Sequence, residues 1–307
     1  MKIFDARFRW RFAVAAGTGA IFGGCTPTWL APLEPNLPLV GPITDTRTGV
    51  KLAREELLAQ VIASRLVILG EAHDNPVHHR LQAEVLEAML RAGRTPALAL
   101  EQFDREHQAA IDNARAGGER DPERIANAGR LDRKGWRWLE YKPLVELALK
   151  FDLPLLAANF SREEARRQMR SGSPAQGVPP AGLALRAGLE QDIVAGHCGI
   201  RPGDAVLNGM IEAQRARDAR MAEVLAGADE KGAVLVAGSG HARRDRGAPS
   251  YLSSTVRENV LSVGLVEVSP DGDLRPAAYA GIYDVVWFTP RAVREDPCLD
   301  LKLPGAK

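Results

Sequence analysis

The chain has 307 residues, of which 45% are hydrophobic and 26% charged, and its formal net charge is +1 at pH 7. These fractions are ordinary for a folded globular protein, and the small charge gives no basic excess to support nucleic-acid binding. No run of 18 or more apolar residues follows the first thirty positions, which excludes a protein with several membrane-spanning helices. The length suits one large α/β domain or two small ones.

The start of the chain has the layout of a bacterial secretion signal. An apolar stretch rich in small residues, 12–24, ends at Cys25 and follows four basic residues, Lys2, Arg7, Arg9 and Arg11. Its end, Ile-Phe-Gly-Gly-Cys, resembles a bacterial lipobox, although Phe22 stands where an aliphatic residue is usual. We expect residues 1–24 to be a signal peptide and Cys25 to carry a lipid; another cleavage site or an uncleaved anchor is the alternative. Thr26 replaces the aspartate that usually retains lipoproteins in the inner membrane, which favours a periplasm-facing outer-membrane lipoprotein.

Residues 25–49 are rich in proline and threonine, which predicts an extended tether leading from the membrane to a single domain at 50–307. Loss of residues 1–24 removes four positive charges and one negative charge, so the formal charge changes from +1 to −2. Apart from the predicted lipidation site, the cysteines are Cys198 and Cys298, in a compartment where disulfides persist. Their pairing stays open, because the sequence does not show the distance between them.

Within the domain, short apolar runs alternate with amphipathic segments. Strands are predicted at residues 65–70, 96–103, 154–160, 232–240, 259–268 and 283–290. Helices are predicted at residues 76–92, 104–116, 142–151, 161–170, 183–195 and 207–226. Apolar strands that alternate with helices are typical of an α/β fold with a mainly parallel sheet covered by helices on both faces. The glycine- and proline-rich stretch 171–182 is predicted to be a loop or the boundary of a helical subdomain at about 117–230.

Polar residues stand at the ends of four predicted strands. Glu71 and His73 follow the first strand, Glu101 lies at the end of the second, Asn159 ends the third, and His241 follows the fourth. The carboxyl ends of parallel strands meet at one edge of a sheet, where α/β proteins bind their ligands. A histidine or glutamate in one such place is more often structural. The convergence of several of them favours a functional site.

His73 and His241 occur in similar surroundings, since each follows a glycine by three residues, in Gly-Glu-Ala-His and Gly-Ser-Gly-His. Imidazole is the commonest side-chain metal ligand and a general base near neutral pH. One interpretation is a divalent-metal site formed by His73, His241 and Glu71. In a related interpretation, the chain is a metal-dependent hydrolase of the esterase or peptidase type, in which Glu71, His73, Glu101 and His241 are catalytic.

Two further pairs of residues border this edge of the predicted sheet. His78 and His79 lie in the first turn of the helix after Pro76, where the helix dipole disfavours an imidazolium, so both are predicted to be neutral. Arg105 and Arg162 follow the second and third strands in the similar sequences Phe-Asp-Arg and Phe-Ser-Arg. Each is able to offer a guanidinium to a carboxylate of a ligand. A solvent-exposed surface residue is the alternative for all four.

Five stretches of the chain, in order across residues 66–252, carry a family resemblance. They read LVILGEAHDNPVHHRLQ, LALEQFDR, EYKPLVELALKFDLPLLAANFSR, HCGIRPGDAVLNGMIEAQRARDARMA and VLVAGSGHARRDRGAPSYL. Together they resemble the ChaN-like haem-binding lipoproteins of the erythromycin-esterase/ChaN-like and Tiki superfamily. The resemblance implies an α/β fold and a role in iron or haem uptake. It also implies a haem held between the two protomers of a homodimer by an axial tyrosine that a histidine assists.

The resemblance also suggests which side chains would contact the haem. Tyr141 is the first choice for the axial ligand, because it lies in a matching stretch, on an expected loop above the sheet edge and beside the aromatic sequence Gly-Trp-Arg-Trp. The full set of expected cofactor-binding residues is Tyr141, His73, His79, Arg105, Arg162 and His241. The two arginines are assigned to the haem propionates. A haem-binding lipoprotein is the leading hypothesis, the metal-dependent hydrolase is the alternative, and a structural lipoprotein with an idle site is the third reading.

Overall fold

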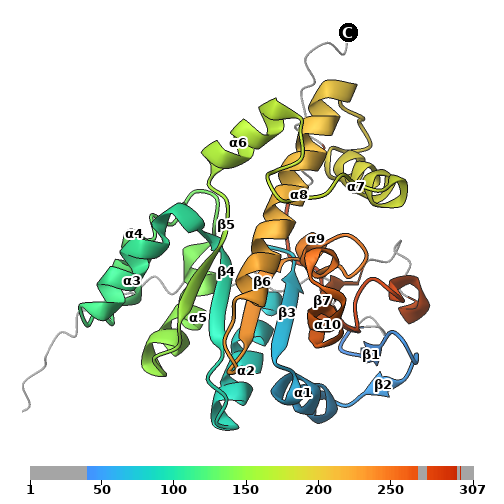
Figure 1. Cartoon of the computed structure of the whole chain (residues 1–307). Coiled ribbons are helices and arrows are strands. Elements are labelled where there is room, and N and C mark those ends of the chain that lie inside the picture. Colours follow the sequence, from blue (N-terminus) through green and yellow to red (C-terminus); the bar gives the residue numbers. More distant parts are fainter. Residues whose placement is uncertain (1–39, 269–274, 296–297, 299–307) are drawn as a thin grey trace, which may run out of the picture. The chain divides into compact units, whose positions relative to one another are not determined.

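The computed structural model describes residues 40–268, 275–295 and 298 of the chain (Figure 1). The described residues all belong to one compact unit, which includes the stretch 117–230. The predicted signal peptide and its cysteine lie outside the described residues. Within the described ranges, no helix combines the length and the apolar character needed to cross a membrane.

The described residues contain an eight-stranded sheet in the order β2-β1-β8-β7-β3-β6-β4-β5. The strands are β1 (Ile43–Asp45), β2 (Lys51–Leu52), β3 (Leu66–Glu71), β4 (Ala97–Asp104), β5 (Leu155–Asn159), β6 (Ala233–Gly238), β7 (Val260–Glu267) and β8 (Val285–Thr289). The strands from β8 to β5 pair in parallel, whereas β1 runs antiparallel to both β8 and β2. The prediction of a mainly parallel α/β sheet is therefore confirmed.

Helices cover both faces of the sheet (Figure 1). One layer contains α1 (Arg54–Ala63), α2 (Pro76–Arg91), α3 (Gln108–Ala116), α4 (Pro122–Ala128) and α5 (Trp138–Lys150). This layer packs on alternate strand residues such as Val67 and Leu69. On the other face, α8 (Asp204–Ala226), α9 (Ser239–Ala242) and the short helix η2 (Ala248–Tyr251) pack with the intervening residues, such as Leu66 and Ile68. Because successive side chains of a strand point to opposite faces, two covered faces require the continuous apolar strands seen in the sequence.

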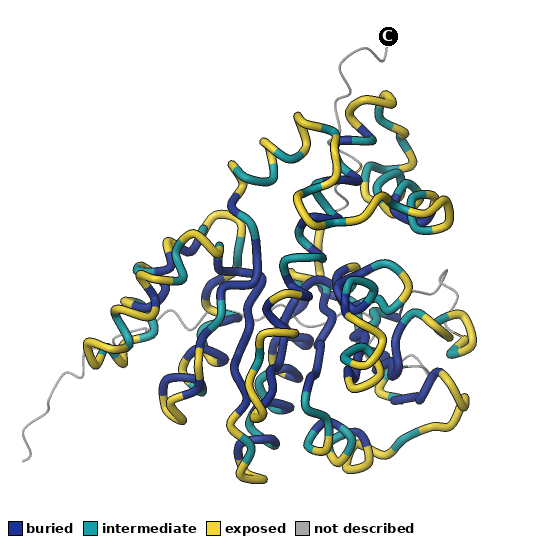
Figure 2. The backbone as a smooth tube through the Cα atoms, viewed as in Figure 1, coloured by how far each residue is buried: buried dark blue, intermediate teal, exposed yellow. Residues whose placement is uncertain are grey.

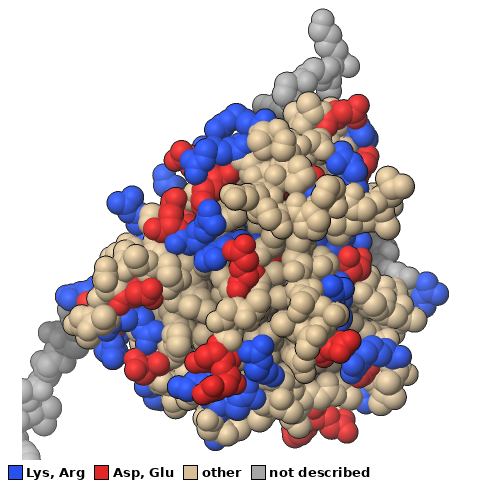
Figure 3. Space-filling view, in the orientation of Figure 1, with Lys and Arg blue, Asp and Glu red and all other residues tan. Residues whose placement is uncertain are grey.

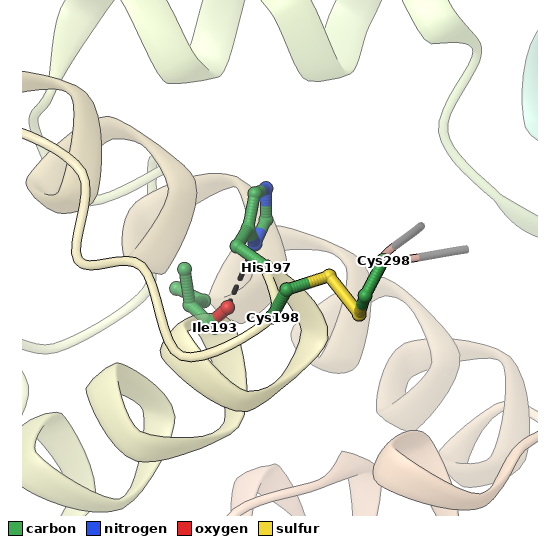
Figure 4. The surroundings of a disulfide bond; sticks show 4 residues. All are labelled: Ile193, His197, Cys198 and Cys298. Atoms are coloured by element: carbon green, nitrogen blue, oxygen red, sulfur yellow. Dashed lines mark hydrogen bonds between the residues drawn. A yellow bond between two sulfur atoms is a disulfide. The ribbon is translucent and has the colours of Figure 1, made fainter. Parts of the chain in front are cut away.

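Two helices extend the structure beyond the strand ends. They are α6 (Arg162–Ser171) and α7 (Leu183–Gly196), which pack along α8 and are more exposed than the sheet below them (Figure 2). The loop after α7 contains Cys198, which is disulfide-bonded to Cys298 with a Cα–Cα distance of 5.7 Å (Figure 4). The bond ties this loop to the end of the chain. The remaining short helices are η1 (Arg105–His107), α10 (Ser254–Glu258) and η3 (Pro276–Tyr279).

The local signals in the sequence place most elements to within a few residues. Asn75 caps α2 by accepting a hydrogen bond from the backbone N–H of Val77, and Ser161 and Glu164 form the predicted capping box of α6. The main difference lies in the expected tether, 25–49, because its described part contains β1. All three residues of β1 are buried, and the strand pairs with β8 near the other end of the chain.

Candidate functional site

The strand-end residues Glu71, His73, Glu101 and His241 meet at one edge of the sheet. They come from three adjacent strands, β3, β6 and β4, whose carboxyl ends lie side by side. The two oxygens of Glu101 lie 3.4 Å from His241 Nε2 and 3.9 Å from His73 Nε2. The predicted convergence of these four side chains is confirmed.

Glu71 is the centre of a buried network of hydrogen bonds. Its side chain has no solvent exposure, and five donor groups surround it. Oε1 lies 2.9 Å from His73 Nδ1, 2.5 Å from the Tyr141 hydroxyl and 3.4 Å from Gln102 Nε2, whereas Oε2 lies 2.7 Å from Gln82 Nε2 and 3.2 Å from His79 Nδ1. Burial opposes ionisation, but the charges of His79 and His73 hold the pKa of Glu71 well below its usual range. Glu71 is therefore an anion whose task is to position its neighbours.

Glu101 is a second buried carboxylate, and it lies between the two strand-end histidines. The backbone N–H of Gly238 donates to its Oε2 at 2.7 Å. Burial would raise the pKa of Glu101, but the nearby charges of His241 and His73 lower it to about 2. Glu101 is thus ionised at neutral pH and faces an imidazole on each side.

His241 is positioned by the carboxylate of Asp218, a residue of α8. Its Nδ1 lies 2.7 Å from Asp218 Oδ1, and its side chain is only 8% exposed. Burial opposes protonation, yet the charges of Glu101 and Asp218 raise the pKa of His241 to about 10. His241 is consequently an imidazolium that lies between the buried carboxyl groups of Glu101 and Asp218.

His73 differs from the other histidines of the site because its side chain is 43% exposed. Its Nδ1 lies 2.9 Å from Glu71 Oε1, whereas its Nε2 lies 3.9 Å from Glu101 Oε2, beyond hydrogen-bonding distance. The ring lies over Gly238, where a Cβ atom would come within 2.8 Å of Nε2. Trp136 covers one side of the imidazole edge-to-face, with ring centroids 4.9 Å apart. Burial opposes protonation of His73, but the charges of Glu101 and Glu71 raise its pKa above the usual value, so a ligand that binds at Nε2 has to displace a proton. The ring of His73 is therefore fixed in place, and its side chain is partly accessible.

Tyr141 does not lie on a loop above the sheet edge, as the sequence analysis expected. It belongs to α5 and has 0% exposure, and its hydroxyl donates to Glu71. Burial and the charge of Glu71 raise the pKa of Tyr141 far above its usual range, because a phenolate there would face a buried anion. A tyrosine needs an accessible, ionisable oxygen to bind haem iron, and Tyr141 has neither property in this arrangement.

The two histidines at the start of α2 differ in charge, one neutral and one positive, which corrects half of the prediction. Burial lowers the pKa of His78 to about 4, and its Nδ1 accepts the backbone N–H of Ala72 while Nε2 lies 2.7 Å from the Thr289 hydroxyl. Burial also opposes protonation of His79, but Glu71 and Glu140 raise its pKa to about 10. Two adjacent carboxylates outweigh the helix dipole. His79 is only 2% exposed, so it supports the site from within and does not face a cofactor.

The two arginines predicted to bind a ligand's carboxylates are both engaged in ion pairs. Arg105 makes two hydrogen bonds to Glu164 Oε1, at 2.8 and 3.0 Å, and its guanidinium stacks on Phe160. Arg162 Nη2 lies 2.6 Å from Asp132 Oδ2. Asn159, the third strand-end residue, is buried, and its side-chain oxygen accepts the next backbone N–H along the chain.

The structure does not contain the expected metal site in a preformed state. Within the described residues, a single group of three brings potential ligand atoms within 4.8 Å of one another, and it consists of Asp104, Glu106 and His107. His73, Glu71 and His241 are therefore not arranged as such a group. This geometry gives the metal-dependent hydrolase no support.

Sequence reasoning missed several residues that build the site. Asp218, to which the sequence analysis gave no role in the site, is fully buried and holds His241. A signal for it existed, because Asp218 lies three residues before Met221 on the buried face of α8, and a buried carboxylate needs a partner. Gln82 and Gln102, which donate to Glu71, carried no comparable signal.

Comparisons with known proteins identify a matching family and a shared fold. A family model described as "Haem-binding uptake, Tiki superfamily, ChaN" matches residues 57–252. The structure resembles that of ChaN of Campylobacter jejuni with cofacially bound haem, at 24% identity and a TM-score of 0.68, over 80% of this chain and 95% of the other. The erythromycin esterase EreC, at 11% identity and a TM-score of 0.48, covers 84% of this chain and 99% of its own. A search of the curated proteins finds no match.

Proposed function

Since this chain belongs to the haem-binding uptake family of the Tiki superfamily that includes ChaN, we propose that it binds haem at the strand-end site, with His73 as the iron ligand. The observation that supports this choice is the state of His73 Nε2. The His73 side chain is 43% exposed, and within the part of the chain that the structure describes no hydrogen bond involves its Nε2. Haem, when bound, supplies the iron that this nitrogen would coordinate.

The surroundings of His73 fit a haem ligand. A metal-binding histidine usually donates its other ring N–H to a carboxylate or carbonyl, which fixes the ring and makes the free nitrogen more basic. Glu71 has this role here, and its remaining donors keep it in place. Trp136, at the side of the imidazole, provides an aromatic surface for a porphyrin. In this proposal His73 alone contacts the iron. The buried hydrogen-bond and charge network around Glu71 and Glu101 is completed by Tyr141, His79 and His241.

A hemin titration tests the assignment of His73 against that of Tyr141. The protein comprising residues 26–307 should shift the Soret band of hemin. His73→Ala should weaken hemin binding more than about tenfold, because loss of even a residue that only supports a metal ligand typically lowers the affinity about 10–100-fold. Tyr141→Phe removes one hydrogen bond to Glu71 and leaves the exposed surface intact. It should retain the wild-type band position. Loss of the band in Tyr141→Phe with retention in His73→Ala would contradict the proposal, as would a wild-type protein that never shifts the band.

We also propose that the protein is an outer-membrane lipoprotein, anchored through Cys25, which handles haem or iron at the cell envelope as a homodimer. The basic start, the apolar stretch and the lipobox-like sequence before Cys25 support the anchor. The family supports the role in uptake.

Expression of the full chain in a bacterial host tests the anchor. The wild type should incorporate radiolabelled palmitate and fractionate with the outer membrane, and Cys25→Ser should lose the label. Thr26→Ser is a matched control that retains the cysteine. A wild-type chain without label would refute the lipid anchor, and gel filtration of the hemin-loaded domain would refute the homodimer if only monomer eluted.

A further inference from the structure

A cavity of about 520 Å³ lies between α6 and α8, beside the ends of β4 and β5. Arg105 and Phe160, which directly follow these two strands, both line it. The carboxyl ends of parallel strands are where α/β proteins bind ligands, and the volume lies within the range of about 300–1,000 Å³ that is typical of small-molecule sites. None of the four strand-end side chains of the proposed haem site lines this cavity.

The charged side chains around this cavity leave one positive charge in excess, because three arginines and two glutamates line it. Arg105 donates two hydrogen bonds to Glu164 Oε1, at 2.8 and 3.0 Å, so these two charges neutralise each other. Arg167 pairs with Glu163, which does not line the cavity, and this pair is exposed and therefore weak. Over α6, acidic and basic side chains lie interleaved on the surface (Figure 3).

Arg220, the third arginine of the cavity, is held only by long contacts. Its Nη1 lies 3.4 Å from Glu223 Oε2 and its Nη2 lies 3.5 Å from the backbone oxygen of Ala157. Charge-assisted hydrogen bonds are usually about 2.7–2.9 Å long. The Arg220 side chain is only 22% exposed, whereas that of Glu223 is 66% exposed. A largely buried guanidinium with such weak contacts gains free energy from an anion placed at its Nη atoms.

The uncharged part of the lining suits an apolar group. It includes Phe160 and Val178 together with the small side chains of Ala175, Ala216 and Ala219. Small side chains leave room for a ring or a short hydrocarbon chain beside Phe160. Because the excess is a single positive charge, a monoanion neutralises it and a dianion would overcompensate it.

We propose that this cavity is a second ligand site, which binds a small monocarboxylate with an apolar body, and that Arg220 binds the carboxylate. The planar guanidinium matches the two oxygens of a carboxylate, and the apolar body lies against Phe160 and the alanines of α8. Neither haem nor iron takes part, so the site stands or falls independently of the function proposed above.

Fluorine NMR titrations of the purified protein test the site with 4-fluorobenzoate and its neutral isostere, 4-fluorobenzamide. The acid should bind about tenfold more tightly than the amide, as expected for one charge-assisted hydrogen-bonded pair. Arg220→Ala should abolish this preference by weakening binding of the acid alone, and Arg220→Lys should restore part of it. Ala219→Leu, which adds a larger side chain to the lining, should weaken the acid and the amide alike.

Arg217→Ala is the matched control and should keep the wild-type preference. Arg217 belongs to the same helix and its Nε, like that of Arg220, is buried without a hydrogen-bond partner among the described residues, but Arg217 does not line the cavity. A wild type without the preference, a preference that survives in Arg220→Ala or one that disappears in Arg217→Ala overturns the proposal. Tighter binding of the dianion 4-fluorophenyl phosphate overturns the choice of a monocarboxylate. Circular dichroism melting identifies misfolded variants; if Arg220→Ala is one, unchanged affinities in Ala219→Leu overturn the site.

Discussion

Gly238 illustrates how one residue without a side chain shapes the site. A Cβ atom at this position would lie 2.8 Å from Nε2 and 2.9 Å from Cε1 of His73, closer than real Cβ atoms approach a neighbour. The same residue donates its backbone N–H to Glu101. The sequence Gly-Ser-Gly-His was noticed for its histidine, but its first glycine also provides the space in which the other histidine lies.

Gly238→Ala is predicted to displace the imidazole of His73 and so to weaken hemin binding about tenfold or more, while the overall fold persists. Hemin titration and circular dichroism melting measure the two effects. Gly240→Ala is the control, because a Cβ atom at Gly240 meets no atom within 4 Å. Equal hemin affinity in both variants and the wild type would show that the contact between Gly238 and His73 is unimportant.

His78 and His79 show where reasoning from a single helix stops. Both lie in the first turn of α2, so the helix dipole acts on them alike. His78 points to a threonine and a backbone amide and stays neutral, whereas His79 points to Glu71 and Glu140 and is charged. The difference arises from side chains of β3 and α5, which the local sequence of α2 does not specify.

At the scale of elements, the strands and helices with strong local signals were predictable. The helix α2 has proline at its first position, Asn75 as N-cap and apolar residues at helical spacing, and all three signals act within the helix. The short strand β1 has no such signal. It exists because its three residues pair with β8, more than two hundred residues later in the chain, and because both faces there are covered.

The helix α8 combines predicted and unpredicted features. Its length and position follow from its sequence, and its apolar residues pack on the sheet face as expected. Its polar residues acquire their roles only from neighbours. Asp218 lies against His241, which belongs to α9 just after β6.

At the scale of the whole molecule, the buried charges predict a maximum of stability in mildly acidic solution. His79 and His241 have pKa values raised to about 10, above the ordinary value of 6.5, so their contribution is complete below pH 6.5 and is lost as the pH rises through 10. The pKa of Glu101 is lowered to about 2, so its contribution is present above pH 4.5 and is lost as the pH falls towards 2. The neutral His78, with a pKa near 4, adds to the loss in acid.

Urea unfolding at a series of pH values measures this dependence. The free energy of unfolding should decrease from pH 6.5 to 10 by at most about 1.4 kcal/mol per pH unit for each of the two histidines. His79→Gln should remove one of the two contributions and make the decrease shallower. A free energy that stays constant over this range would contradict the assignment of charged histidines paired with Glu71 and Glu101.

The sequence by itself determined the fold class, the order of the main strands and helices, and the strand-end residues that meet at the site. These features follow from hydrophobic periodicity, from caps, and from the rule that parallel strands end at the same edge. Only the tertiary structure decided the state of each side chain. It buried Tyr141 against Glu71 and left His73 partly exposed. It also paired Arg105 with Glu164 and Arg162 with Asp132. Charge and accessibility were not predictable because they depend on contacts between residues far apart in the chain.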